Sequence, residues 1–222
     1  VPSYLFVVGE AAVRGGDAAD AESARKLEDA YGRGAFEGLS GLQPDWGEDG
    51  IAFVSYRGED PDSTLVTDVF TVSPEGGEAT AITDGDMTCN SPTWSPDGER
   101  LAFSAGDDTN WCIPTEARVW DGEEHVSVTG DLDRTLARGS SFEWVGDGRF
   151  YTLVGDEART RVIRCDAEEA DWERTFEAQG DDRAVAGLSI GGDTAAMGLS
   201  HPSEGHDPYA LPVDDLAADE RS

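Results

Sequence analysis

The feature that most constrains the fold of this 222-residue chain is an internal repeat. Three segments share one pattern: QPDWGEDGIAFVS at 43–55, SPTWSPDGERLAFS at 91–104 and SFEWVGDGRFYTL at 141–153. A more divergent fourth copy, GLSIGGDTAAMGL, occupies 187–199. The anchor residues of the four copies, spaced by 48, 50 and 46 residues, are Trp46, Trp94, Trp144 and Ile190. A repeat of this length indicates a fold built from similar structural units.

Each copy predicts the same local structure. A short apolar strand ends at the anchor, and a tight turn follows that contains Gly50, Gly98 or Gly148. Glycine takes a positive φ in such turns without steric cost, and aspartate hydrogen-bonds its own backbone there. A second, largely apolar strand comes next, at 51–55, 101–105 and 150–154. Strands that are apolar on both faces suit a sheet packed between two neighbouring sheets.

The rest of each repeat supplies two more predicted strands. These lie at 68–72 and 79–83, at 117–120 and 124–128, and at 161–165 and 174–177, while the fourth copy keeps 209–213. Four strands in each repeat predict an all-β fold, a β-propeller of about four four-stranded blades plus a partial N-terminal strand. A β-sandwich with coincidental turns is the alternative.

The repeat also suggests boundaries. We expect a strand of a preceding blade plus an acidic loop at 1–38, blades at 39–90, 91–138 and 139–183, a partial blade at 184–216 and a tail at 217–222. Residues 18–30 are expected to form a short acidic helix or to be disordered. The three tryptophan anchors are interpreted as blade core. Because the chain has no initiator methionine and opens within a strand, we expect it to be a fragment.

The charge of the chain is extreme, with 47 acidic and 16 basic residues and a net charge of −31. Lys26 is its only lysine. Self-repulsion of this size destabilises a compact state, but at molar salt the Debye length falls to about 3 Å and screens it. The composition resembles that of halophilic archaeal proteins; an acidic protein with a specialised partner is the alternative. No nucleic-acid partner is expected, because phosphate binding needs clustered basic residues.

Other sequence features bear on location. No stretch approaches the roughly 18 apolar residues of a membrane span, so no membrane partner is expected. The N-terminal segment lacks the basic region and cleavage site of a signal peptide. Cys89, Cys112 and Cys165 are widely spaced and fit buried free thiols better than a disulfide framework. Together these features predict a cytoplasmic protein.

Several motifs resemble one protein superfamily. The segment 91–104 resembles the propeller repeat shared by periplasmic TolB-type proteins and peptidases of the prolyl oligopeptidase family. AITDGD at 81–86 is similar to the LTDGD joint of acylaminoacyl-peptidase-like members, and DVFTV at 68–72 to their DVYVV strand. DRAVAGLS at 182–189 and YAL at 209–211 also resemble segments of those peptidases. The resemblance extends over roughly residues 40–215.

The resemblance implies a non-catalytic propeller portion of an acylaminoacyl-peptidase-like serine peptidase, of haloarchaeal type. Its partners would be an α/β-hydrolase domain of the same protein, absent from this chain, and a peptide substrate passing through. Four blades do not close a ring in this family, so either earlier blades are missing or the propeller is open. A stand-alone TolB-like propeller that serves as a protein-interaction scaffold is the alternative. A free propeller enzyme with its site at the central channel is a third possibility.

One motif suggests catalysis within the chain. GLSIG at 187–191 matches the G-x-S-x-G nucleophile motif around Ser189, and His201 and Asp207 follow it. That motif needs a strand before the serine and a helix after it. Here the repeat places a turn and a second strand after Gly191, so no catalytic residue is predicted.

No metal or cofactor is predicted either, because the histidines lack ligand spacing and the acidic pairs do not continue as calcium loops. Trp111, in an inter-strand loop, is the one candidate for contact with substrate or with the hydrolase. The alternative for Trp111 is an aromatic side chain that covers the propeller surface.

Overall fold

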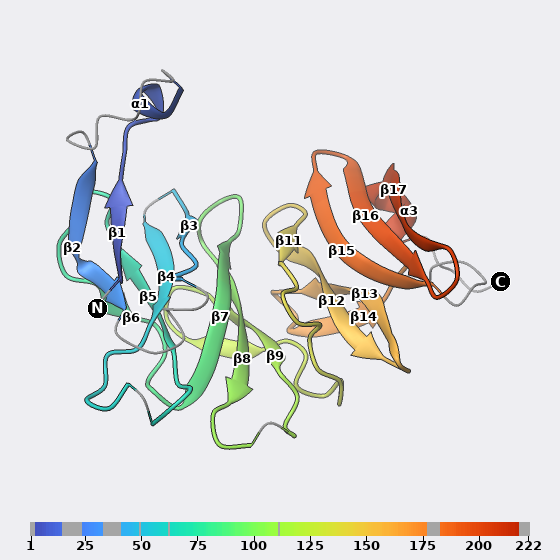
Figure 1. Cartoon of the computed structure of the whole chain (residues 1–222), viewed down its shortest axis with the longest axis horizontal. Helices are drawn as coiled ribbons and strands as arrows, with labels where there is room; N and C mark the ends of the chain where they lie inside the picture. The colour runs from blue at the N-terminus through green and yellow to red at the C-terminus, as the bar shows by residue number, and fades with distance from the viewer. Residues whose placement is uncertain are drawn as a thin grey trace.

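The computed structural model describes residues 3–14, 24–32, 41–48, 50–61, 63–110, 112–176 and 183–217. In these ranges the chain folds into five antiparallel sheets, which we name A to E in chain order. They follow one another in an arc, with sheets A and E at its two ends (Figure 1). The repeat therefore predicted the fold class correctly, an all-β arrangement of propeller blades.

The strands of each sheet are consecutive in the chain. Sheet A contains β1 (Ser3–Val7) and β2 (Arg25–Gly32). Sheet B contains β3 (Asp45–Trp46), β4 (Ile51–Ser55), β5 (Asp68–Val72) and β6 (Thr80–Ala81). Sheet C contains β7 (Met87–Trp94), β8 (Leu101–Asp107), β9 (Glu116–Trp120) and β10 (His125–Ser127). Sheet D contains β11 (Glu143–Trp144), β12 (Arg149–Asp156), β13 (Arg159–Asp166) and β14 (Asp171–Arg174). Sheet E contains β15 (Ala184–Gly191), β16 (Thr194–His201) and β17 (Gly205–Pro212). Two short helices, α1 (Glu10–Arg14) and α3 (Val213–Ala217), accompany the end sheets.

The hydrophobic core lies between consecutive sheets rather than in one central layer. Four buried clusters join A to B, B to C, C to D and D to E. The second strand of each four-stranded sheet carries a fully buried phenylalanine, namely Phe53, Phe103 or Phe150. Strand β4 is buried along its whole length. Apolar residues on both faces are thus buried because each sheet packs between two others.

Carboxylates fasten one sheet to the next. Asp45 at the end of sheet B accepts a hydrogen bond of 2.7 Å from the Trp94 backbone N–H of sheet C. Glu143 of sheet D likewise accepts one of 2.8 Å from the Ile190 N–H of sheet E. Between sheets C and D the Trp144 Nε1–H donates to the Thr93 carbonyl at 3.1 Å. These bonds join the first strands of adjacent sheets, so the first strands lie where the sheets converge.

The N-terminal region differs from the prediction. Within the expected helix at 18–30, residues 25–30 belong to strand β2, and residues 18–23 lie outside the described part of the chain. Leu27 and Ala30 are buried against sheet B, so tertiary packing overrides the local helical pattern. The partial N-terminal strand is therefore half of a two-stranded sheet. The blade expected to begin at residue 91 begins earlier, because its first strand, β7, starts at Met87.

The cysteines were predicted correctly at two positions of three. Cys89 and Cys165 are buried, and burial raises the pKa of the Cys89 thiol to about 12. Cys112 is exposed, because it lies in the loop between β8 and β9 rather than in a strand. In the described residues no helix is long and apolar enough to cross a membrane.

Candidate functional site

The first strands carry an irregular backbone three residues before the anchor. Ser91 in β7 and Gly187 in β15 occupy this position, with φ of 53° and 109°, and Gln43 occupies it just before β3, with φ of 48°. A positive φ is uncommon for residues other than glycine, and it accompanies β-bulges. The register of β7 shifts between Asn90 and Thr93, and that of β15 shifts between Val185 and Leu188. Each bulge interrupts the strand on the converging side of the sheets.

A cavity of about 760 Å³ lies along this converging side, between sheets C and D. Its polar lining consists of uncharged amide and hydroxyl side chains together with one arginine. The uncharged polar residues are Gln43, Asn90, Ser91, Ser104, Thr115, Thr135, Ser140 and Thr160. The arginine is Arg138, and no Asp or Glu is among the described residues of the lining. In a chain of net charge −31 this cavity is a neutral to cationic region.

Hydrogen bonds hold the cavity wall in place. The Gln43 side chain donates to Asn90 Oδ1 at 3.1 Å and accepts from the Ser91 N–H at 2.7 Å. The Ser104 hydroxyl donates to the Asn90 carbonyl at 3.2 Å. On the other wall, the Thr115 N–H donates to the Thr135 hydroxyl at 3.2 Å. The wall is therefore preorganised rather than formed by loose loops.

A buried acid organises the end of the β12–β13 hairpin. The side chain of Asp156 is 2% exposed and lies 2.8 Å from both Arg134 Nε and Arg174 Nε, with Arg161 Nε at 3.6 Å. The hydrogen bond from Arg174, with that from Arg134, lowers the pKa of Asp156 despite its burial. Glu157 in the adjoining turn binds Arg161 at 2.7 Å. The cluster joins the loop before sheet D to strands β13 and β14.

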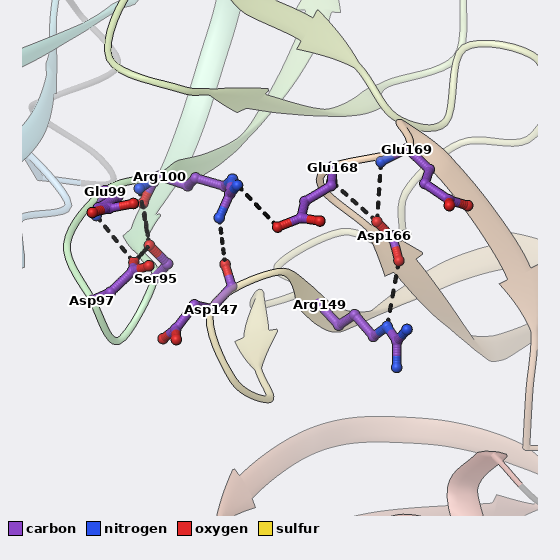
Figure 2. Close-up of polar contacts among 9 residues, drawn as sticks. All are labelled: Ser95, Asp97, Glu99, Arg100, Asp147, Arg149, Asp166, Glu168 and Glu169. Carbon is purple, nitrogen blue, oxygen red and sulfur yellow. Dashed lines mark hydrogen bonds and ion pairs between the residues drawn. The ribbon is translucent and has the colours of Figure 1, made fainter.

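On the opposite side of the sheets, charged side chains connect the short turns. Figure 2 shows Arg100, in the β7–β8 turn of sheet C, reaching toward sheet D, where it donates to the Asp147 carbonyl and to Glu168, each at 3.2 Å. Arg149 pairs with Asp166 across β12 and β13 at 3.3 Å. Arg149, Asp166 and Glu168 border a cavity of about 280 Å³. The bonds from Arg100 to the Asp147 carbonyl and to Glu168 join sheet C to sheet D (Figure 2).

The tryptophan anchors do not share one environment. Trp94 and Trp144 are partly buried and pack against the clusters of sheets B–C and C–D. Trp46 is 58% exposed, so its prediction as core was wrong. The Trp94 ring lies on Gly47, where an added Cβ would be 2.7 Å from it, so this anchor packs on the turn of the preceding sheet. In the described part of sheet A no equivalent turn covers Trp46.

The turn glycines also differ from one repeat to the next. Gly98 has φ of 72°, as its turn requires. In sheet D the positive φ of 70° belongs to Gly146 instead of Gly148. The backbone hydrogen bond that closes the turn joins Ser95 to Arg100 in sheet C but Val145 to Arg149 in sheet D. The sheet D turn is therefore one residue shorter, and its positive φ falls on a different glycine. Gly50 lies against the Val72 carbonyl, 3.4 Å from where a Cβ would stand.

Ser189 is not a nucleophile elbow. It lies within β15, and the chain turns at Gly192 and continues as β16, where Ala196 pairs with Ser189. His201 lies five residues beyond Ala196 on β16, and thus ~17 Å further along the strand. His201 Nδ1 instead contacts the nearby Ser203 hydroxyl at 3.0 Å. The interpretation of this motif as a blade turn is confirmed.

The remaining candidates from the sequence are Trp111 and groups of metal-ligating side chains. Trp111 lies outside the described residues, so its contact with substrate or hydrolase stays a prediction. No group of three or more His, Cys, Asp or Glu side chains that could hold a metal occurs in the described ranges.

Sequence reasoning missed the Asp156 cluster and Arg138. The sequence does mark both regions, because the segments 134–142 and 158–165 contain arginines but no Asp or Glu, which is unusual in so acidic a chain. Neither signal indicates which side chains meet in space.

No protein-family model matches this chain, and no curated protein matches it. Solved structures do. The β-propeller domain of the Trilobed protease from Pyrococcus furiosus, described as having an open velcro topology, matches with a TM-score of 0.61 and 14% identity, over 86% of this chain and 56% of that one. Acylaminoacyl peptidase from Pyrococcus horikoshii matches with a TM-score of 0.59 and 16% identity, over 76% of this chain and 25% of that one. TolB from Acinetobacter baumannii matches with a TM-score of 0.58 and 17% identity, over 95% and 46%.

These similarities establish the fold. The chain is similar to β-propeller domains of prolyl endopeptidase and acylaminoacyl peptidase proteins, and to TolB. This chain spans little more than half of the Trilobed protease propeller domain, and less than half of the acylaminoacyl peptidase and of TolB.

Proposed function

We propose that this chain is the non-catalytic propeller portion of a serine peptidase similar to acylaminoacyl peptidases of the prolyl oligopeptidase family. The observation that carries the proposal is the propeller fold shared with such peptidases, combined with a hairpin at the one nucleophile-like motif. The motifs at 68–72 and 81–86 support the peptidase resemblance. There the Thr83 hydroxyl and the Gly85 N–H both donate to Asp68, at 2.7 and 2.8 Å, and so fix the joint before sheet C.

In this proposal the propeller controls access and a separate α/β-hydrolase domain performs the chemistry. That domain would transfer the acyl group of a peptide to a serine and then hydrolyse the ester. The blades would limit entry to short peptides by excluding folded proteins. The acidic, lysine-poor composition supports a haloarchaeal setting for this enzyme. The buried free thiols of Cys89 and Cys165 support the proposal that it is cytoplasmic.

A stand-alone scaffold is the second candidate. It is favoured by the similarity to TolB, which covers 95% of this chain. Such a protein would present its blades to partner proteins and would need no hydrolase domain.

Expression of the whole reading frame that contains this chain tests the two candidates. A fluorophosphonate probe should label a serine outside residues 1–222 in the full product, and should leave the 222-residue chain unlabelled. The full product should also cleave a short N-acetylated peptide much faster than a folded protein containing the same sequence. Labelling of Ser189 would contradict the proposal, and a reading frame without any labelled serine would favour the scaffold.

A further inference from the structure

Arg138 has an unusual position in the charge pattern of this protein. Acidic residues outnumber basic ones by 47 to 16, and nearly every arginine is engaged in an ion pair or hydrogen bond. Among the described lysines and arginines, Arg138 alone has no hydrogen bond or ion pair. A cation left unpaired amid so many carboxylates suggests a site kept for an external anion.

The backbone fixes Arg138 at the cavity. The Ser140 N–H donates to the Ala137 carbonyl at 3.0 Å, and Gly139 has φ of 75°, which together define a tight turn with glycine at the third position. The Ala137 N–H donates to the Leu153 carbonyl at 2.7 Å, so the turn is tied to β12. Arg138 is exposed and lines the 760 Å³ cavity described above. The turn therefore fixes the backbone of Arg138 at the cavity wall, and its guanidinium remains accessible.

The surrounding wall determines which anion fits. Ser140 and Thr160 have hydroxyls without a hydrogen-bond partner among the described residues, and Asn90 retains unused N–H donors. Hydroxyl and amide groups both donate and accept, which matches the N–H and C=O groups of a peptide. A phosphate only accepts, carries more charge and would meet a single cation in a strongly acidic protein. One planar guanidinium instead suits a carboxylate, which it binds through two parallel hydrogen bonds.

We propose that this cavity binds the C-terminal carboxylate of a peptide. Arg138 holds the carboxylate, and the hydroxyls of Ser140 and Thr160 meet the adjacent peptide groups. The volume lies within the roughly 300–1,000 Å³ of typical small-ligand sites. The site belongs to the propeller itself, so it does not depend on the proposed hydrolase domain. Both a free peptide and the C-terminal tail of a protein carry this chemistry.

The test uses the 222-residue chain and the tetrapeptide Gly-Ala-Ser-Ala, with a free carboxylate or a C-terminal amide. Binding is followed by NMR chemical-shift titration at a salt concentration where circular dichroism shows a folded chain. The acid should bind with Kd below about 10 mM, and the amide at least about tenfold more weakly, because hydrogen bonds to charged groups contribute that much or more. A third probe carries the same four residues at the C-terminus of a folded protein. Equal binding of this probe identifies protein tails as ligands, whereas binding of the tetrapeptide alone identifies free peptides.

Variants locate the site. Arg138→Ala should weaken binding of the acid by roughly 10- to 100-fold, and Arg138→Lys should restore part of the loss. Arg149→Ala is the matched control, since Arg149 is also exposed but lies at the opposite end of β12 from the cavity residue Gly155. It should leave binding unchanged. Equal affinity for acid and amide, no binding up to 10 mM, or an Arg138→Ala variant that binds normally would each overturn the proposal.

Discussion

Replacement of Asp156 by asparagine tests whether the arginine cluster stabilises sheet D. The substitution keeps the size of the side chain but removes the charge that faces Arg134, Arg161 and Arg174. Two of these contacts are hydrogen bonds of 2.8 Å to a carboxylate that is almost fully buried. The variant leaves three guanidinium groups around an amide that carries no charge.

The expected loss can be worked from these two bonds. A hydrogen bond to a charged group contributes about 1.5–3 kcal/mol, and the low end applies because Arg134 and Arg174 are about 40% exposed to water. The free energy of unfolding should therefore fall by about 3 kcal/mol. For a chain of this size that corresponds to a decrease in Tm of roughly 6–12 °C.

Thermal unfolding followed by circular dichroism in molar KCl measures the effect. Asp133→Asn is the control, because Asp133 is 93% exposed and lies 3.7 Å from the same Arg134. Its effect on the free energy of unfolding should stay within about 0.5 kcal/mol. If Asp156→Asn had the same Tm as Asp133→Asn, the stabilising role assigned to the arginine cluster would be refuted.

The pH dependence gives a second measurement on the same variants. The folded pKa of Asp156 lies below its unfolded value, so its contribution is complete above about pH 4 and is lost as the pH falls through the folded pKa. The difference in Tm between the parent chain and Asp156→Asn should therefore shrink under acidic conditions. A difference of constant size down to pH 2 would contradict this origin.

Three further predictions concern the joints between sheets, the thiols and the salt response. Glu143→Ala should lower the free energy of unfolding by about 1–3 kcal/mol, because the Ile190 N–H loses its acceptor. Glu173→Ala is the control and should have little effect, because Glu173 is exposed. Equal Tm values for the two variants would exclude a stabilising role of the Glu143 bond. Under native conditions a maleimide should modify Cys112 alone, and Cys89 and Cys165 should react only after unfolding. Mass spectrometry counts the modified thiols. Modification of all three in the native protein would contradict the burial of Cys89 and Cys165. The Tm should rise steeply between 0.1 and 3 M KCl as screening relieves the net charge of −31, and a flat response would exclude salt adaptation.

Much of the architecture followed from local sequence patterns. Strand, turn and strand around each anchor depend on alternation of apolar residues and on turn-forming residues that are neighbours in the chain. That is why the hairpin at Ser189 could be distinguished from a catalytic elbow before the structure was known. The same local logic failed for residues 25–30, where burial of Leu27 against sheet B decides in favour of a strand.

Contacts between sheets were outside the reach of those patterns. Trp46, Trp94 and Trp144 are equivalent in sequence, yet Trp46 is exposed because its burial depends on the sheet that precedes it. Asp156 meets arginines 22 and 18 residues away, and Arg138 lines a cavity with Gln43, which no local pattern connects to it. The sequence by itself determined the repeated hairpins and the overall charge, since both depend on residue type and short spacing. Only the tertiary structure decided which anchors are buried, which charges are paired and which arginine remains open to a ligand, because these depend on distances between sheets.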